Sequence, residues 1–293
     1  MIRVSAEVRE ARAVVALETT LVAHGFPPGE GIEIGLESER RVRDAGAVPA
    51  TVGVLDGEIV VGLSERELER FDENARKVGP RDLAACAAQR AVGATTVGGT
   101  LAVCRAVGIR FMGTGGIGGV HRGWQEQLDV SADLGELARS QAVVVSAGAK
   151  SLLDVSATAE LLETFGVPVL GWRTDELPLF YTARGGPSVS ARVEDIDEVA
   201  RIAAAHWTDL QRGGILVARP PDDSLDDVGP LIDGAVAAAE AEGVRGPMVT
   251  PFVLSYLHTQ SGGATLRANK ELVAANARLA AEICVAYARL ADG

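Results

Sequence analysis

Short apolar runs alternate with segments of helical periodicity through most of the chain. The apolar runs predict strands at residues 13–17, 49–55, 58–61, 95–97, 109–112, 142–145 and 167–171. Between them, apolar and charged residues recur with helical spacing at residues 31–45, 81–92 and 132–140, and a long amphipathic helix is predicted at 264–290. Strands that alternate with helices predict an α/β fold: a three-layer α/β/α domain around a central, mostly buried sheet.

Turn and cap residues refine this picture. Asp56-Gly57 separates two predicted strands and is typical of a tight hairpin, so the sheet is expected to be mixed rather than purely parallel. Ser64, with Glu67 three residues later, predicts a capping box that opens a short helix. Residues 184–190 and 222–229 are loop-like, but neither stretch is long enough to separate domains. We therefore expect one domain over residues 1–293.

Composition and charge exclude several classes of protein. Hydrophobic residues make up 47% of the chain and aromatic residues only 4%, which predicts a core of small aliphatic side chains. The formal charge of −12 disfavours nucleic acids and anionic membranes as partners. Three widely spaced cysteines without a CxxC pair predict reduced, buried thiols. Residues 1–18 lack a signal-peptide pattern and no run approaches the ~20 apolar residues of a membrane span, so we expect a cytoplasmic protein.

A glycine-rich loop follows the strand predicted at 109–112. Residues 113–118 fit GxGxxG, and Asp133 lies 20 residues after Gly113, as in a dinucleotide-binding fingerprint. The loop does not open into a helix, however, but continues through further glycines and His121-Arg122. This context favours a close-approach loop whose backbone N–H groups can meet an anion. A nicotinamide-dependent oxidoreductase remains an alternative.

Lys150 is the strongest candidate for the chemistry. A buried strand leads through small residues to this lysine, and ligands bind at the carboxyl ends of strands in α/β sheets. An apolar pocket lowers the pKa of a lysine, and the free amine can add to a carbonyl carbon to form an iminium that accepts electrons. The other interpretation is a surface lysine at a helix start, although the helix dipole disfavours a cation there.

Three further residues are candidates for acid–base chemistry or binding. Glu18 ends an apolar strand, where a half-buried carboxyl can act as general acid or base, or can belong to a structural ion pair. Asp129 precedes the helix at 132–140 and could hold a hard divalent cation that keeps most of its waters, while Ser131 and Asp133 could simply cap that helix. Lys77 belongs to a basic segment ahead of a helix and fits either a phosphate clamp or a solvated loop.

Taken together, these segments resemble the pseudouridine-5′-phosphate glycosidase family, which is related to the indigoidine synthase A-like proteins. The matching stretches are residues 16–20, 45–51, 77, 81–83, 93–97, 114–123, 129–134, 147–151 and 163–168, with the C-terminal helix. Gly79-Pro80 stand where the family has more basic residues, which puts the local phosphate contacts in doubt. Residues 173–188 are less familiar and receive no role.

The resemblance implies the reversible conversion of pseudouridine 5′-phosphate and water to uracil and ribose 5-phosphate. It implies that Lys150 adds at C1′ of the ring-opened sugar as a Schiff base, that Glu18 is the proton donor and that Asp129 is the Mn²⁺ ligand. It implies substrate contacts at Lys77, Val97, Thr114, His121, Ser131, Ala132, Asp133 and Asn276. It also implies a homotrimer of three-layer α/β/α domains.

Other functions remain open at this point. A different Schiff-base lysine enzyme, such as an aldolase acting on a sugar phosphate, would use Lys150 but would not need Glu18 beside a nucleobase. A non-catalytic sugar-phosphate sensor would need neither. The sequence leaves open the direction of the reaction in the cell, the replacement of Mn²⁺ by Mg²⁺, and an indigoidine-type role.

Overall fold

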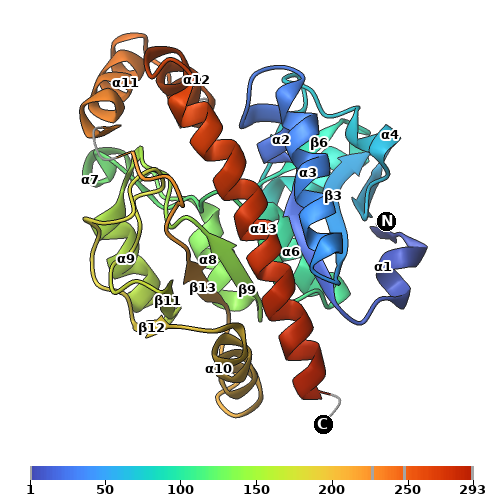
Figure 1. Cartoon of the computed structure of the whole chain (residues 1–293). Coiled ribbons are helices and arrows are strands. Elements are labelled where there is room, and N and C mark those ends of the chain that lie inside the picture. Colours follow the sequence, from blue (N-terminus) through green and yellow to red (C-terminus); the bar gives the residue numbers. More distant parts are fainter. Residues whose placement is uncertain (1, 226–227, 247–248, 292–293) are drawn as a thin grey trace.

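The computed structural model describes residues 2–225, 228–246 and 249–291 and is built around one large sheet (Figure 1). Within the described residues this sheet has 11 strands. Its main path runs β1 (Ile2–Val4), β4 (Glu58–Val61), β3 (Val48–Leu55), β2 (Val14–Glu18), β7 (Phe111–Gly113), β9 (Val143–Ser146), β13 (Ile215–Ala218), β11 (Val169–Trp172) and β12 (Ala191–Val193). Two short strands, β5 (Arg76–Val78) and β6 (Gly93–Thr95), extend it beside β3.

The sheet is mixed, as predicted. The central strands β2, β7, β9, β13 and β11 are all parallel, whereas β3 is antiparallel to β4 and to β6. Alternate residues of a strand face opposite sides of the sheet. In β2, Val15 and Leu17 pack into one hydrophobic cluster and Ala16 into another. The sheet is therefore buried on both faces, which is why its strands read as continuous apolar runs.

Helices cover both faces and confirm the three-layer α/β/α prediction. The helix α13 (Ala264–Ala291) crosses the front of the sheet in Figure 1 and packs on α3 (Glu30–Asp44) and α10 (Ile196–Thr208). On the other face α6 (Val97–Val107) packs against α8 (Ala132–Arg139), with α5 (Leu83–Ala88) and α9 (Val155–Thr164) in the same core cluster. Near the start of α13, α11 (Gly229–Ala241) and α12 (Val249–Gln260) pack together.

The remaining elements are short. They are α1 (Ala6–Glu10), α2 (Thr20–His24), α4 (Glu65–Leu68), α7 (Trp124–Gln127), the 3₁₀ turn η1 (Pro80–Asp82), and the two-stranded sheet formed by β8 (Val120–His121) and β10 (Leu153–Asp154).

Several predicted elements needed correction. The strand predicted at 95–97 ends at Thr95, and Val97 is the first residue of α6, because Thr96 caps that helix. The helix predicted at 81–92 begins with η1 and ends at Ala88, since the chain must then turn into β6. Lys150 is not at a helix start: α9 begins five residues later, at Val155, and Asp154 caps it. The loop predicted at 222–229 falls partly outside the described residues, and Gly229 already belongs to α11.

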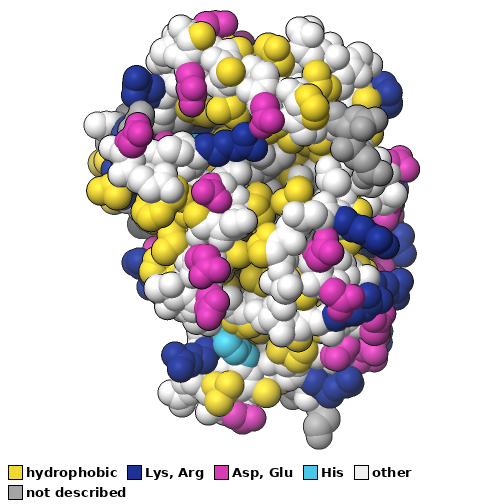
Figure 2. Space-filling view, turned by 90° about the vertical axis from the view of Figure 1, so that its left-hand side faces the viewer, with side chains coloured by type: hydrophobic (Ala, Val, Ile, Leu, Met, Phe, Trp, Pro, Cys, Tyr) yellow, Lys and Arg dark blue, Asp and Glu magenta, His cyan; other side chains and the backbone are white. Residues whose placement is uncertain are grey.

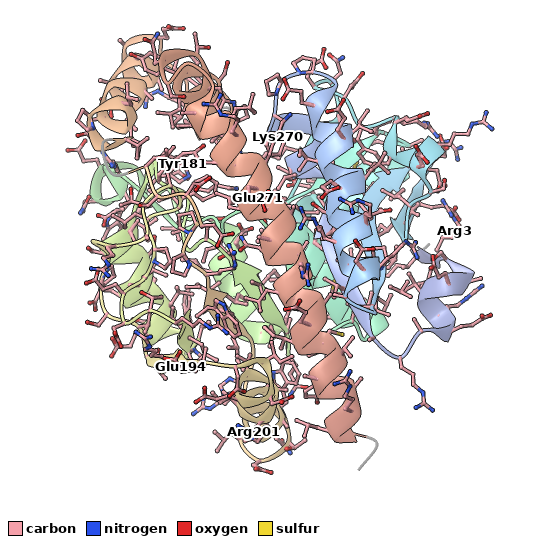
Figure 3. The ribbon with its side chains drawn as sticks, viewed as in Figure 1. Arg3, Tyr181, Glu194, Arg201, Lys270 and Glu271 are labelled. Atoms are coloured by element: carbon pink, nitrogen blue, oxygen red, sulfur yellow. The ribbon has the colours of Figure 1, made fainter. Side chains whose placement is uncertain are left out.

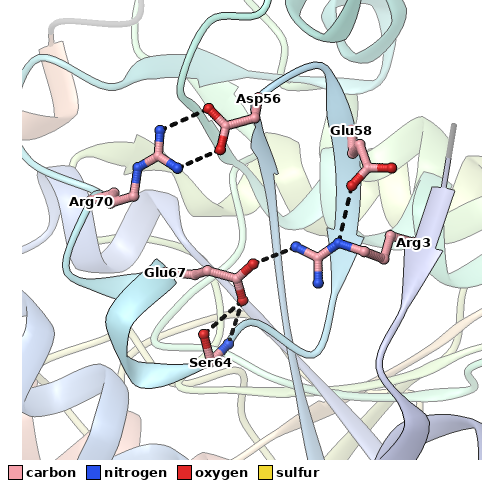
Figure 4. Close-up of polar contacts among 6 residues, drawn as sticks. All are labelled: Arg3, Asp56, Glu58, Ser64, Glu67 and Arg70. Carbon is pink, nitrogen blue, oxygen red and sulfur yellow. Dashed lines mark hydrogen bonds and ion pairs between the residues drawn. The ribbon is translucent and has the colours of Figure 1, made fainter.

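The predicted hairpin and capping box are both present at the β3–β4 edge (Figure 4). Leu55 pairs with Glu58, and Asp56 and Gly57 between them have φ of 53° and 91°, the left-handed geometry of a tight two-residue turn. Ser64 and Glu67 form the reciprocal cap of α4. Ion pairs of Arg3 with Glu58 and Glu67, and of Arg70 with Asp56, lie on this exposed edge and contribute little to stability.

The surface carries charges of both signs, and the cysteines are buried thiols as predicted. On the face shown in Figure 2, acidic and basic side chains are interspersed with scattered apolar ones. None of the described helices is long and apolar enough to cross a membrane. All three cysteines are free and buried, and burial raises the pKa of Cys104 and of Cys284 to about 12, so neither thiol is an activated nucleophile.

Candidate active site

The candidate site lies where three neighbouring parallel strands end. Glu18 is the last residue of β2, Thr114 directly follows β7, and Lys150 lies four residues beyond β9. The loops after β7 and β9 are joined by backbone hydrogen bonds, from Ala147 N to Gly115 O at 2.8 Å and from Lys150 N to Ile117 O at 3.1 Å. These bonds fix the backbone of Lys150 although it belongs to no helix or strand.

Glu18 is a buried carboxyl with a hydroxyl partner. It is 6% exposed, and the Thr114 hydroxyl donates a hydrogen bond to Oε1. Burial raises the pKa of Glu18, and this effect outweighs the opposing influence of Lys150, of the Thr114 hydrogen bond and of Lys77. The carboxyl therefore holds its proton to a higher pH than an ordinary glutamate, which suits a proton donor.

The two threonines after Glu18 connect β2 to β6. Thr19 Oγ1 donates to Val52 O at 2.8 Å and accepts from Thr95 N at 2.9 Å, and Thr20 Oγ1 donates to Ala94 O at 2.9 Å. Ala94 pairs in turn with Lys77 on β5. This chain of contacts brings Lys77 to the same end of the sheet as Glu18.

Lys77 is a desolvated cation among charged groups. Burial lowers its pKa from 10.5 to about 8, nearby Lys150 acts in the same direction, and Asp133, Glu18 and Asp129 oppose the shift. Lys77 and Lys150 line the same two spaces, described next. The structure thus brings together the three residues that the sequence suggested for acid, amine and anion contacts.

The first space, which we call the inner cavity, is largely apolar. Its apolar wall comes from Leu21, Phe180, Pro251 and Leu254. Its polar residues are Glu18, Thr20, His24, Lys77, Thr114, Lys150, Thr250 and Asn269. A planar apolar group with a polar edge fits such a lining.

The second space, which we call the outer groove, also borders the two lysines and has many charged and polar residues in its lining. It is lined by Lys77, Arg81, Thr96, Gly118, His121, Asp129, Ser131, Ala132, Asp133, Arg139 and Lys150, among others. The inner cavity and the outer groove share Lys77, Lys150 and Thr250. A molecule with one apolar and one charged end could therefore span both spaces beside the two amines.

Two helix N-termini meet at the outer groove. Thr96 caps α6 and Ser131 caps α8, and both caps accept from backbone N–H groups. The Asp133 carboxylate accepts from Gly98 N at 2.7 Å and from Gly118 N at 2.8 Å, so it ties the glycine loop to the start of α6. A Cβ on Gly118 would lie 2.4 Å from Ser131 Oγ, which explains the glycine there. Helix N-termini favour anions.

Asp129 and His121 form the candidate metal site. Asp129 Oδ2 lies 3.9 Å from His121 Nδ1, and the Asp129 side chain is 42% exposed. Burial lowers the pKa of His121, against the attraction of Asp129. No group of three or more His, Cys, Asp or Glu side chains gathers in the described part of the chain. One accessible carboxylate fits a hard cation that retains most of its waters, and does not fit a caged zinc ion.

Two predicted contact residues lie away from the cavity surfaces. Asn276 on α13 is fully buried and donates from Nδ2 to Thr114 O at 2.8 Å, so it supports the loop and lines neither space. Val97 as a whole residue is 1% exposed and lines neither space. The Asn276 amide nitrogen is used behind Thr114, and a contact of Asn276 with the substrate stays a prediction.

Sequence reasoning missed much of the inner cavity. His24, Phe180, Thr250, Leu254 and Asn269 line it, but they come from α2, a loop, α12 and α13. One signal exists in the backbone: Phe180 has φ of 66°, a strained conformation that is commonest at functional sites. The sequence itself carries no such signal.

This fold and site define an α/β enzyme with an amine and a carboxyl of raised pKa at the carboxyl edge of its sheet. The family model described as "Indigoidine synthase A like protein" matches residues 3–286, and the chain belongs to this family. Within the family, the chain is 46% identical to a pseudouridine-5′-phosphate glycosidase of Myxococcus xanthus, covering 98% of this chain and 99% of the relative. It is 45% identical to the protein of the same name from Chloroflexus aurantiacus, over 99% and 100%.

Solved structures agree with this family membership. The crystal structure of the prealnumycin C-glycosynthase AlnA in complex with ribulose 5-phosphate superposes with a TM-score of 0.90, at 38% identity and over 100% of this chain and 98% of that one. An indigoidine synthase A-like protein from Thermotoga maritima gives 0.88 at 38% identity, over 97% and 96%. The family match and these structures favour the fold described above over a dinucleotide-binding domain, and the glycine loop enters β8 rather than a helix.

Proposed function

We propose that this chain catalyses the reversible cleavage of the carbon–carbon glycosidic bond of pseudouridine 5′-phosphate, giving uracil and ribose 5-phosphate. The observation that carries the proposal is the meeting of the Lys150 amine and the raised-pKa Glu18 carboxyl in one inner cavity. The relatives named for this reaction match nearly the whole chain. The AlnA structure adds that a related protein joins a C-glycosidic bond and binds a pentose phosphate.

Lys150 supplies the nucleophile in this mechanism. Its amine forms a bond to C1′ while the bond from C1′ to the ring oxygen breaks, and that oxygen leaves as a hydroxyl with a proton. The sugar is then open and attached to the enzyme through nitrogen. The nitrogen lone pair can now form a C1′=N iminium as the bond to the base breaks, which is the electron sink that a carbon leaving group requires.

Glu18 supplies the proton that the leaving base requires. Protonation of the uracil ring carbon that bears the sugar lets the electrons of the breaking bond return to the ring, so free uracil leaves. Water then hydrolyses the iminium to ribose 5-phosphate and the free amine, and Glu18 is reprotonated. One water is consumed in total, and the reverse sequence joins the base to the sugar.

The outer groove receives the phosphate end. Lys77 contributes positive charge below its pKa of about 8, and the N-termini of α6 and α8 contribute the positive ends of their helix dipoles. Ser131 and Ala132 lie at the start of α8, and Asp133 is occupied in tying the loop to α6. We assign Asp133 to positioning rather than to direct phosphate contact, because a carboxylate repels an anion.

We further propose that Asp129, with His121 beside it, binds a hydrated Mn²⁺. When bound, the ion would add positive charge at the phosphate side of the site. Asp129 and His121 line the outer groove, and their donor set fits such an ion. The family resemblance also supports a homotrimer, and we propose the cytoplasm as its location. Light scattering should then give a mass three times 30.4 kDa.

The proposed reaction is tested by incubating the protein with uracil, ribose 5-phosphate and Mn²⁺. We expect uracil to disappear and a C-nucleoside phosphate to form, and Lys150→Met should lower the rate by about 1,000-fold or more, as loss of a covalent nucleophile does. An aldolase would leave uracil unchanged, an oxidoreductase would require a nicotinamide, and a sensor would bind the sugar phosphate without turnover. No C-nucleoside from a protein that still binds Mn²⁺ would disprove the proposal.

A further inference from the structure

His24 carries a half-buried imidazole at the inner cavity that the mechanism above does not use. It is the last residue of α2, six positions after Glu18, and it lines the cavity with Glu18, Lys77 and Lys150. Its Nε2 lies 3.0 Å from the carbonyl oxygen of Ala75. A carbonyl oxygen only accepts, so Nε2 carries the proton of this bond.

The other ring nitrogen is therefore left as an acceptor. Burial lowers the pKa of His24, the nearby Lys77 acts in the same direction, and the Ala75 hydrogen bond opposes the shift only in part. The imidazole is thus neutral near pH 7, with its lone pair at Nδ1. That Nδ1 is buried and has no hydrogen-bond partner among the residues that the structure describes. Buried polar atoms without a partner are rare and call for an explanation.

The uracil base of the proposed substrate provides N–H donors that could pair with Nδ1 of His24. Uracil carries two ring N–H groups, and both stay free when the sugar is attached through carbon. An N-linked nucleotide of the same base keeps only one of them. The apolar wall of the cavity offers Leu21, Phe180, Pro251 and Leu254 to the ring faces, and its other side-chain acceptors are the oxygens of Glu18, Asn269 and the threonines at positions 20, 114 and 250.

We propose that His24 determines base specificity by accepting a ring N–H of uracil at Nδ1, with the Ala75 carbonyl fixing the tautomer. This inference rests on the proposed function, because it assigns a base to the inner cavity. The inference makes a prediction of its own about base specificity. An acceptor at this position favours bases with a free ring N–H and disfavours bases in which that nitrogen is alkylated.

Two variants separate this role from a structural one. His24→Gln places an amide N–H near the position of Nε2, so it keeps a donor for Ala75 and removes the acceptor. His24→Asn places an amide oxygen near the position of Nδ1, so it keeps an acceptor and removes the Ala75 bond. A structural role predicts that Asn is the worse variant, and a base-reading role predicts that Gln is the worse one.

The experiment measures C-nucleoside formation from ribose 5-phosphate with uracil, 1-methyluracil or 3-methyluracil, at saturating Mn²⁺. In the native protein, methylation of the contacted nitrogen should lower kcat/KM by about 10- to 100-fold, the usual cost of one buried hydrogen bond. In His24→Gln that penalty should shrink at least fivefold at one of the two nitrogens, with the loss for uracil appearing in KM. His24→Asn should retain most of the penalty.

The outcomes are distinguishable. If both methylated bases are discriminated equally well by the native protein and by His24→Gln, or if the penalty falls at both nitrogens together, the proposal is wrong. Matching thermal melts of the variants exclude misfolding. A native protein that forms no product from uracil itself overturns the proposed function instead.

Discussion

The inner cavity and the outer groove are two ends of one site that differ in their access to solvent. The inner cavity withholds water from Glu18, and that desolvation raises the pKa of its carboxyl. The outer groove gathers charge at Arg81, Asp129 and Arg139, where solvent still reaches the side chains. The contrast indicates that acid–base chemistry takes place in the inner cavity, which we call the dry end. Anions and cations bind in the outer groove, which we call the wet end. Lys77 and Lys150 line both.

The sharpest test of the dry end is Glu18→Gln. The amide keeps the shape but cannot donate an acidic proton, so kcat should fall by about 100- to 10,000-fold with little change in KM. The same substitution should raise the stability of the protein relative to wild type at neutral pH, although it lowers kcat. A raised pKa means that the native state binds more protons than the unfolded chain, so wild-type stability falls as pH rises above the ordinary glutamate value.

The Gln variant lacks this titration. Its melting temperature relative to wild type should therefore increase between pH 4 and pH 8, as scanning fluorimetry can measure. A kcat within tenfold of wild type would show that Glu18 is not the proton donor.

Lys77→Met tests the boundary between the two spaces. Loss of the cation should raise KM for the phosphorylated sugar by about 10- to 100-fold, the range for one charged hydrogen bond. Because burial lowers the pKa of Lys77 to about 8, the unfolded chain binds more protons than the native state from about pH 8 to 10.5. Wild-type stability should rise across that window, so the Met variant should be more stable at pH 7, by roughly 1–3 kcal/mol, with no advantage above pH 10.5.

The matching control is Lys77→Arg, which remains charged at all these pH values. It should remove any alkaline limb near pH 8 from the profile of kcat/KM. An unchanged limb would assign that titration to another group.

Asp129→Asn tests the wet end. The half-saturating Mn²⁺ concentration should rise by about 10- to 100-fold, and activity should recover at high metal concentration. Asp233→Asn is the control, because Asp233 is exposed and its ion pair with Arg122 lies on the surface. Equal metal requirements in wild type and in Asp129→Asn would remove Asp129 from the metal site.

Arg81→Ala is expected to have the smallest effect. The Arg81 side chain is 92% exposed although it lines the outer groove, so solvent and salt screen it. KM for the sugar phosphate should rise about two- to threefold at low salt and hardly at all at high salt. Arg76→Ala is a matched control, because Arg76 pairs with Gln89 and does not line the groove. Equal effects of both substitutions would indicate only a change in net charge.

The candidate catalytic residues at strand ends could be predicted from the sequence, whereas most residues that line the inner cavity could not. Glu18 and Lys150 could be found because apolar strands lead straight to them, and the parallel order of β2, β7 and β9 brings them together. The alternation of strands and helices likewise gave the layers. Val97 was misplaced in a strand because Thr96, as the cap of α6, ends the extended segment one residue earlier.

The missed residues depend on tertiary packing. Leu254 and Thr250 reach the inner cavity because α12 packs beside α13, and nothing in that apolar helix indicates a ligand. Asn269 lies one turn from the site end of α13, next to Lys270, which is labelled on that helix in Figure 3. The Lys270 ammonium pairs with Glu30 at 2.6 Å. Asn276, two turns later, donates to Thr114 O inside the fold, and its predicted contact with the substrate stays a prediction.

The central claim is that Lys150, and not Lys77, forms the covalent bond to the sugar. The chain contains only three lysines, Lys77, Lys150 and Lys270, so the bond can be located without ambiguity. Ribose 5-phosphate and borohydride should add one sugar phosphate to the protein, and the proteolytic peptide that contains Lys150 should carry it. Lys77→Arg should still be labelled and Lys150→Arg should not. Labelling of Lys77, or undiminished labelling of Lys150→Arg, would contradict the account.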